Sequence, residues 1–209
     1  MEKTFAFIDA SNLFYGGEKS LGWKIDYQKL LKYLKNKYSV SKAYYFGGVE
    51  TYNFKHSYSD DSVPLEKLKL YLSKEIKTKG KELGQAELIL VNRYLQRIKF
   101  YLKLEKFGYE LVLKPVKLYS QDDGTKRRKA NCDVDMAFYM MREKDILSRA
   151  VILSGDGDFL PVLKYLKKEG KEVIVLSRGP RTAREIRQFA GSNFRDFVRL
   201  EKFVKFEGK

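Results

Sequence analysis

The sequence predicts an α/β protein, a three-layer α/β/α sandwich built on a mainly parallel sheet. Short apolar segments alternate along the chain with longer segments in which apolar residues recur at helical spacing. That alternation is typical of a parallel sheet covered by helices on both faces. The 209 residues suit one domain with a sizeable core, and no linker or internal repeat divides them. We therefore expect a single domain over residues 1–209, with a helical or irregular insertion at about 50–84.

The first half of the chain begins with a strand and continues with a helix and a second strand. Residues 4–8 form an apolar run that ends at Asp9, which is typical of a buried parallel strand. Asp26 is suited to cap a helix, because Leu30, Leu31 and Leu34 follow it at helical spacing. Residues 43–46 predict the second strand, which the next two glycines end.

The middle of the chain predicts two helices, a strand and a loop. Residues 50–84 are polar and lysine-rich, with a loop near 57–62 followed by a helix. A long helix is expected from about 85 to 107, with Gly108 as its C-terminal cap. Residues 109–116 predict a third strand, and residues 120–131 a polar loop.

The last third alternates regularly between helix and strand. Val134, Ala137, Phe138 and Met141 form an apolar stripe, and we expect this stripe to face the core. The strands expected after it cover residues 150–153, 173–176 and 197–200, and the helices between them cover residues 159–166 and 182–189.

Composition restricts the partners and the surroundings of the protein. Lys and Arg number 42 against 27 Asp and Glu, which gives a net charge of +15. This excess favours nucleic acid, ahead of an anionic membrane surface, as the partner. Cys132 is the single cysteine, which excludes an intrachain disulfide and indicates a reducing, cytoplasmic setting. No apolar run approaches the length of a membrane span, so no membrane association is expected.

Aspartates follow the strands at the places where parallel sheets form their binding sites. Asp9 ends the first strand, and Asp156 and Asp158 follow the strand at residues 150–153. Asp133 and Asp135 open the helix that precedes that strand. Sites in open α/β sheets lie at the carboxyl ends of the strands. If the first strand and the strand at residues 150–153 are neighbours, these acids converge.

Converging carboxylates predict a bound divalent cation, because they repel one another when buried. A site with oxygen ligands, in a chain with one histidine and one cysteine, favours Mg²⁺ or Mn²⁺ over Zn²⁺. Such ions assist the hydrolysis of phosphodiester bonds. Each aspartate taken alone also fits a plainer role: Asp158 suits a helix cap, and Asp135 suits a solvated helix surface.

Three segments together resemble the NYN domain family, a branch of the PIN-like nucleases. They are Phe7-Ile8-Asp9-Ala10-Ser11-Asn12, Asn131-Cys132-Asp133-Val134-Asp135 and Leu153-Ser154-Gly155-Asp156-Gly157-Asp158-Phe159. The segment from Ala190 to Phe194 also fits, and the likeness spans nearly the whole chain except residues 50–84. The resemblance implies a PIN-like, Rossmann-like topology and metal-dependent cleavage of RNA rather than DNA.

The resemblance also implies roles for individual residues. Those that match the metal-site acids of the family are Asp9, Asp133, Asp156 and Asp158. Asn12 matches a polar residue that orients Asp9, and Ser154 matches a serine that contacts phosphate or positions a carboxylate. Asp135 is expected to support the same site.

Two departures from the family pattern keep a second function open. Lys129 lies one position further back than the family lysine, and Tyr139 stands where some members carry another acid. A reduced set of acids favours the alternative, a non-catalytic RNA-binding or adaptor module.

Two basic segments are candidates for contacting nucleic acid. The first is Lys126, Arg127, Arg128 and Lys129, a run that precedes Asp133, and the second contains Arg178, Arg181 and Arg184. A flexible, solvated loop explains the first segment about equally well. In the second, Arg181, Arg184 and Arg187 are spaced by three and partly share a helix face, which slightly favours contact with a nucleic-acid backbone over plain solvation. A second copy of this chain is the other partner that the sequence leaves open.

Overall fold

A single parallel sheet organises the fold. The computed structural model describes residues 3–14, 19–57, 62–79, 84–120 and 126–208, and only the backbone of residues 79, 118–120 and 126–129. Six strands, all parallel to their neighbours, pair in the order β3-β2-β1-β6-β7-β8. They are β1 (Thr4–Asp9), β2 (Val40–Val49), β3 (Glu110–Pro115), β6 (Arg149–Leu153), β7 (Glu172–Ser177) and β8 (Phe194–Asp196). The predicted fold class, an α/β/α sandwich with a parallel sheet, is confirmed.

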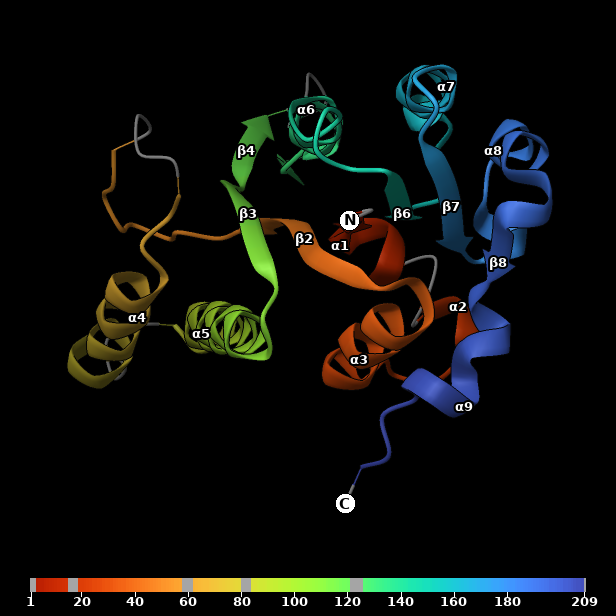
Figure 1. The fold of residues 1–209 in the computed structure, drawn as a ribbon. Helices are drawn as coiled ribbons and strands as arrows, with labels where there is room; N and C mark the ends of the chain where they lie inside the picture. The colour runs from red at the N-terminus through yellow and green to blue at the C-terminus, as the bar shows by residue number, and fades with distance from the viewer. Residues whose placement is uncertain (1–2, 15–18, 58–61, 80–83, 121–125, 209) are drawn as a thin grey trace.

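Helices cover both faces of this sheet (Figure 1). On one face lie α3 (Tyr27–Tyr38), α4 (Leu65–Lys79), α5 (Gln85–Phe107) and α9 (Glu201–Val204). On the other face lie α6 (Asp133–Arg142), α7 (Leu160–Lys168) and α8 (Arg184–Ala190). Short helical turns complete the chain: α1 (Ala10–Asn12), α2 (Lys19–Leu21), η2 (Gly157–Phe159), η3 (Gly179–Arg181), η4 (Gly191–Asn193) and η5 (Phe197–Leu200).

Strand β1 shows how the sequence produces two cores. Successive side chains of a strand point to opposite faces of the sheet. Phe5 and Phe7 therefore pack beneath α6 and α7, whereas Ala6 and Ile8 pack toward α3 and α5. All four are buried, which is why the segment appears in the sequence as an uninterrupted apolar run.

Two helix ends match the caps that the sequence predicts. The Asp26 carboxylate accepts a hydrogen bond from the backbone N of Lys29 at 3.0 Å, at the start of α3. Gly108 ends α5 with a φ of 101°, a left-handed conformation that favours glycine. These caps fix the start of α3 and the end of α5, two of the helices that cover this face of the sheet.

The predicted core face of α6 is wrong. Val134 and Phe138 are 71% and 59% exposed, and the buried residues of this helix are Met136 and Met140. Both sets lie at helical spacing, so periodicity alone did not distinguish them. The structure selects the methionines because they fill the space beneath α6, next to Tyr44 and the β1 phenylalanines.

Two other segments also differ from the prediction. Within the expected loop at 120–131, the backbone of β5 (Lys126–Lys129) pairs antiparallel with β4 (Lys117–Ser120). The strand expected at 197–200 is instead the 3₁₀ helix η5, and the last strand is β8, just before it. Asp196 explains this boundary, because its carboxylate accepts a hydrogen bond from the backbone N of Val198 and caps η5.

The stretch at residues 50–84 contains α4, which packs along α5 (Figure 1). Leu68 and Leu72 of α4 are buried in the same core as α5, so α4 widens the layer on that face. Within the described ranges, no helix combines the length and the apolar character that crossing a bilayer requires.

Candidate active site

The site begins at Asp9, the last residue of the central strand β1. Since β1 lies between β2 and β6, Asp9 stands in the middle of the carboxyl edge of the sheet. Its Oδ1 accepts hydrogen bonds from the backbone N of Ser11 at 2.9 Å and of Asn12 at 3.1 Å. Its Oδ2 accepts a hydrogen bond from Ser154 Oγ at 3.1 Å. Three donor atoms thus hold the carboxylate in one orientation.

Ser154 joins Asp9 to the second predicted acid segment. This serine follows β6, is 2% exposed, and its Oγ accepts a hydrogen bond from the backbone N of Asp156 at 3.2 Å. Asp156 therefore lies two hydrogen bonds from the Asp9 carboxylate. The pairing of β1 with β6 that this convergence requires is observed. Asp156 Oδ1 in turn accepts from the backbone N of Asp158 at 3.0 Å, and the Asp158 side chain is exposed.

Asp133 and Asp135 lie in the first turn of α6. The negative charge of Asp133 acts on Asp9 directly, since it raises the pKa of that carboxyl group. The backbone N of Asp133 donates to Asn131 Oδ1 at 2.9 Å, which starts the helix. Asp135 forms an ion pair with Lys114, the Nζ–Oδ2 distance being 2.8 Å. The structure therefore brings both α6 acids to the edge where Asp9 lies.

Burial dominates the electrostatics of this site. It raises the pKa of Asp9 above the ordinary value of 3.8; the bonds from Asn12 N and Ser154 Oγ offset part of that rise, and the charge of Asp133 adds to it. Burial also raises the pKa of the Cys132 thiol to about 12, with a further contribution from the charge of Asp135. A thiol with so high a pKa stays protonated at neutral pH. The negatively charged atoms that this site offers to a cation are therefore carboxylate oxygens.

Nevertheless, the acids do not form a ready-made metal cluster. In the described part of the chain, no three His, Cys, Asp or Glu side chains gather into a group able to hold a metal ion. Asp9 also forms no ion pair with any described lysine or arginine. An unneutralised, half-buried carboxylate next to a second acid is the environment that a divalent cation stabilises. The carboxylate oxygens of this site are therefore ligands of the kind that Mg²⁺ or Mn²⁺ prefers.

Two polar residues at the site were missed by the sequence reasoning. Lys114, at the end of β3, pairs with Asp135. Glu185, on α8, lies so close to the Asp156–Asp158 turn that a Cβ added at Gly157 would meet its Oε1 at 2.5 Å. Glu185 lies among arginines in the sequence, and no local pattern predicts that α8 returns to this turn.

Asn12 is oriented from the neighbouring strand. Its side-chain Oδ1 accepts a hydrogen bond from Ser177 Oγ at 3.3 Å, while its backbone N holds Asp9. Ser177 ends β7 and is buried. The carboxyl ends of three adjacent strands, β1, β6 and β7, are therefore connected by side-chain hydrogen bonds.

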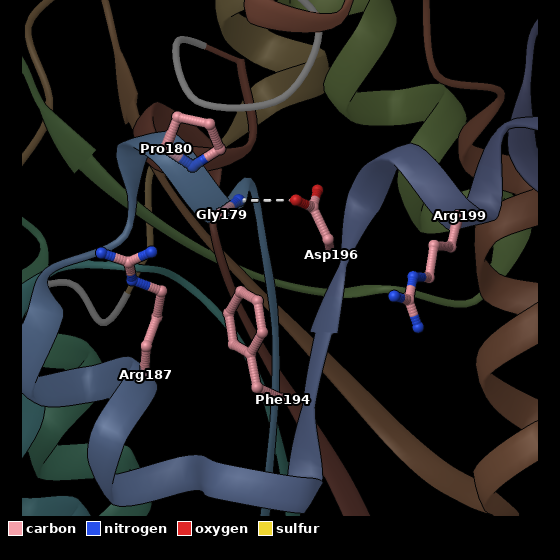
Figure 2. Close-up of a pocket in the computed structure, with 6 residues that line it drawn as sticks. All are labelled: Gly179, Pro180, Arg187, Phe194, Asp196 and Arg199. Atoms are coloured by element: carbon pink, nitrogen blue, oxygen red, sulfur yellow. Dashed lines mark hydrogen bonds between the residues drawn. The ribbon is translucent and has the colours of Figure 1, made fainter.

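Arg178 has a structural contact that the sequence did not predict. Its guanidinium forms an ion pair with Asp196 at 3.1 Å, and the same carboxylate accepts from the backbone N of Gly179. Figure 2 shows Asp196 and Gly179 joined by a hydrogen bond beside a cavity that Arg187 and Arg199 also line.

The other predicted basic residues differ in how far the structure describes them. The side chains of Arg181 and Arg184 are exposed, whereas those of residues 126–129 lie outside the described ones. Contacts of all these basic residues with nucleic acid stay predictions.

Asp196→Ala is expected to lower the free energy of unfolding by about 2 kcal/mol, because three donors lose one acceptor. The donors are the Arg178 guanidinium and the backbone N atoms of Gly179 and Val198. Urea denaturation of the two proteins measures the difference. Asp145→Ala serves as the control, since Asp145 is exposed and, among the residues that the structure describes, pairs only with its neighbour Lys144. An equal effect of both substitutions contradicts the assignment.

Comparison with known proteins identifies a family and a relative of this chain. The NYN domain is the family whose pattern matches this chain, over residues 3–197. The low amplitude and bright protein LabA of Synechococcus elongatus is 22% identical over 203 residues, which cover 95% of this chain and 86% of LabA.

Solved structures add a likeness of fold. The Vibrio parahaemolyticus protein VPA0982, described as of unknown function, superposes with a TM-score of 0.60 at 16% identity, and 98% of this chain and 97% of that chain are covered. The D15 protein of T5, co-crystallized with metal ions, has a TM-score of 0.44 at 17% identity over 89% of this chain and 59% of D15.

Proposed function

The chain belongs to the NYN domain family, and we propose that it is a divalent-metal-dependent nuclease that hydrolyses phosphodiester bonds, RNA in preference to DNA. One observation carries the proposal: Ser154 links the Asp9 carboxylate to Asp156, at an edge where the charge of Asp133 also acts on Asp9. Family resemblance supports RNA as the substrate. The net charge of +15 supports a polyanionic partner.

The ion that the proposal requires is Mg²⁺ or Mn²⁺. The residues that would hold it are the predicted acids Asp9, Asp133, Asp156 and Asp158. When bound, such an ion supplies positive charge where a phosphodiester gains negative charge during attack by water. Asp9 is the acid whose orientation is fixed in advance. Its carboxylate accepts hydrogen bonds from Ser11, Asn12 and Ser154 that hold it in place before any ion binds. This preorganisation removes the cost of orienting the carboxylate during the reaction.

A second function is supported by the position of Tyr139. This residue stands where some family members carry an acid, and its ring packs against Tyr44 and Phe46 at 5.2 and 5.4 Å. The Arg142 guanidinium lies 3.8 Å from the same ring. A site with one acid fewer favours the alternative, an RNA-binding or adaptor module without catalysis.

A cleavage assay distinguishes the two functions. Labelled RNA is incubated with the protein in Mg²⁺, in Mn²⁺ and in excess EDTA. We expect products with either metal and none with EDTA, and Asp156→Asn to reduce the cleavage rate at least a hundredfold, about 2.7 kcal/mol in the barrier. The exposed Asp145 lies in the turn before β6, at the opposite edge of the sheet, so Asp145→Asn should leave the rate unchanged. A mobility shift without products in any metal would instead support the adaptor.

A further inference from the structure

A groove of about 970 Å³ lies between α3 and α5, and one end of it opens beside the acids. Both helices lie side by side on the same face of the sheet (Figure 1). Ala10, Ser11 and Ala130 line the groove at the carboxyl edge of the sheet, and Lys103 and Phe107 line it near the end of α5. The groove therefore leads away from the candidate active site along one helix.

Aromatic rings form much of the groove lining. Tyr27 and Phe100, which are half-buried, meet edge to face with their ring centroids 5.0 Å apart, and Tyr45 packs beneath both of them. Phe14 lies at the mouth beside Ser11 and is 40% exposed. Rings that keep part of their surface open in a groove offer flat faces for stacking.

The charges along this groove are predominantly positive. Lys24, Arg93 and Lys103 line it, and within the described residues none of the three forms an ion pair. Its two acids are already engaged: Glu50 pairs with Arg97 at 3.1 Å, and Asp26 caps α3. The groove thus retains a surplus of cations over an aromatic surface.

Backbone contacts connect the groove to the acids. Ser11 lines the groove, and its backbone N donates to Asp9 Oδ1. Tyr101, which also lines the groove, donates its hydroxyl to the carbonyl of Gly48 at 2.6 Å. A polymer bound along the groove would therefore place the repeat unit that emerges at the Ser11 end next to the carboxylate of Asp9.

We infer that this groove binds an unpaired nucleic-acid strand and directs it to the acid site. Bases stack on the rings of Phe14, Tyr27 and Phe100, and phosphates contact Lys24, Arg93 and Lys103. The single strand is the specific element, because in a duplex neighbouring base pairs stack on one another and hide the faces that aromatic side chains would contact. The inference rests on the proposed function for its substrate class, and it adds a preference for unpaired strands and the surface that creates it.

Binding in EDTA tests the groove apart from any cleavage. The probe is a fluorescent single-stranded RNA of about 15 nucleotides, near the upper end of the roughly 4–16 nucleotides that known single-strand-binding folds cover. The double variant Arg93→Glu, Lys103→Glu is expected to weaken binding at least tenfold and to reduce the salt dependence by roughly one phosphate contact or more. Both residues are exposed, so the fold should tolerate the changes.

The matched control reverses two exposed lysines on the other face of the sheet. Lys164→Glu, Lys168→Glu on α7 changes the net charge equally and should alter binding less than twofold. Equal weakening by both double variants overturns the inference, because general electrostatics would then explain binding. Duplex RNA that binds as tightly as the single strand, or displacement of the RNA by polyglutamate at equal charge, also overturns it.

Further arms identify the strand and separate this inference from the proposed function. Single-stranded DNA of the same sequence shows whether the sugar matters, and binding of either strand supports the groove. Photocrosslinking of 4-thiouridine RNA is expected at peptides that contain Phe14 or Phe100. If the groove variants lose binding while the wild type cleaves nothing in any metal, the groove stands and the nuclease proposal fails. If cleavage is metal-dependent but groove variants bind normally, only the groove is refuted.

Discussion

Asp9→Asn should abolish metal-dependent cleavage and, at neutral pH without metal, stabilise the protein. Burial and the charge of Asp133 raise the pKa of Asp9 above 3.8, so ionising this carboxyl group costs the folded state free energy. An asparagine carries no charge and avoids that cost. It still offers an oxygen to the backbone N atoms of Ser11 and Asn12, so the cap of α1 is kept.

The pH dependence gives this prediction its sign. A carboxyl group whose pKa is raised by folding destabilises the protein above its folded pKa and has no effect below its unfolded pKa. The stability gain of Asp9→Asn is therefore present at neutral pH and disappears as the pH falls through the folded pKa to below 3.8. Urea denaturation in EDTA at several pH values measures the gain. Metal should raise the melting temperature of the wild type and leave that of the variant unchanged.

Asp145→Asn provides a control with the opposite sign. A hydrogen bond from Lys144 lowers the pKa of Asp145, so losing this carboxylate removes a small stabilisation at neutral pH. Cleavage should persist in that variant. The assignment of Asp9 is contradicted if Asp9→Asn cleaves RNA at the wild-type rate, or if it unfolds more easily than the wild type at neutral pH.

Most of the fold could be predicted because the strands are buried on both faces. The runs at residues 4–8, 150–153 and 173–176 are continuous and apolar, and each coincides with a strand of the structure. Helix caps at Asp26 and Gly108 were also predictable, since capping depends on local chemistry. The core face of α6 was not, because two apolar sets share the helical spacing and only the shape of the neighbouring core decides between them.

The candidate site was predictable where it depends on the topology of the sheet. Acids that follow parallel strands meet at one edge, which is how Asp9 and Asp156 come together. Contacts that depend on the return of distant elements were not predictable. Lys114 reaches Asp135 across 21 residues of sequence, and Glu185 reaches the Asp156–Asp158 turn from a different helix.

Gly155→Ala is expected to be among the most destabilising single substitutions in this chain. A Cβ at Gly155 would lie 2.6 Å from Ser177 Oγ, 2.8 Å from Thr182 Oγ1 and 2.9 Å from Thr182 Cα. The last of these atoms belongs to the backbone, and Ser177 and Thr182 are both buried. No side-chain rotation relieves that contact, so the β6 and β7 loops must separate, at a cost of about 2–3 kcal/mol.

Separation of these loops also acts on the acids. The carbonyl of Gly155 accepts a hydrogen bond from the backbone N of Ala183 at 2.9 Å, and Ser154, just before it, holds Asp9. Pushing the two loops apart therefore displaces Asp156 relative to Asp9. We expect cleavage by the folded variant to fall together with stability, as measured by urea denaturation and by RNA cleavage well below the melting temperature.

Gly157→Ala is the matched comparison, because it adds the same methyl group two residues later in the same turn. There the nearest atom is Glu185 Oε1 at 2.5 Å, the end of a flexible side chain, and the next is Ala183 Cβ at 3.4 Å. Rotation of Glu185 relieves the contact, so the expected cost is below about 1 kcal/mol. A reversed order of the two variants would mean that the tight approach of β7 to the Gly155 loop, which keeps Asp9 and Asp156 together, does not exist in solution.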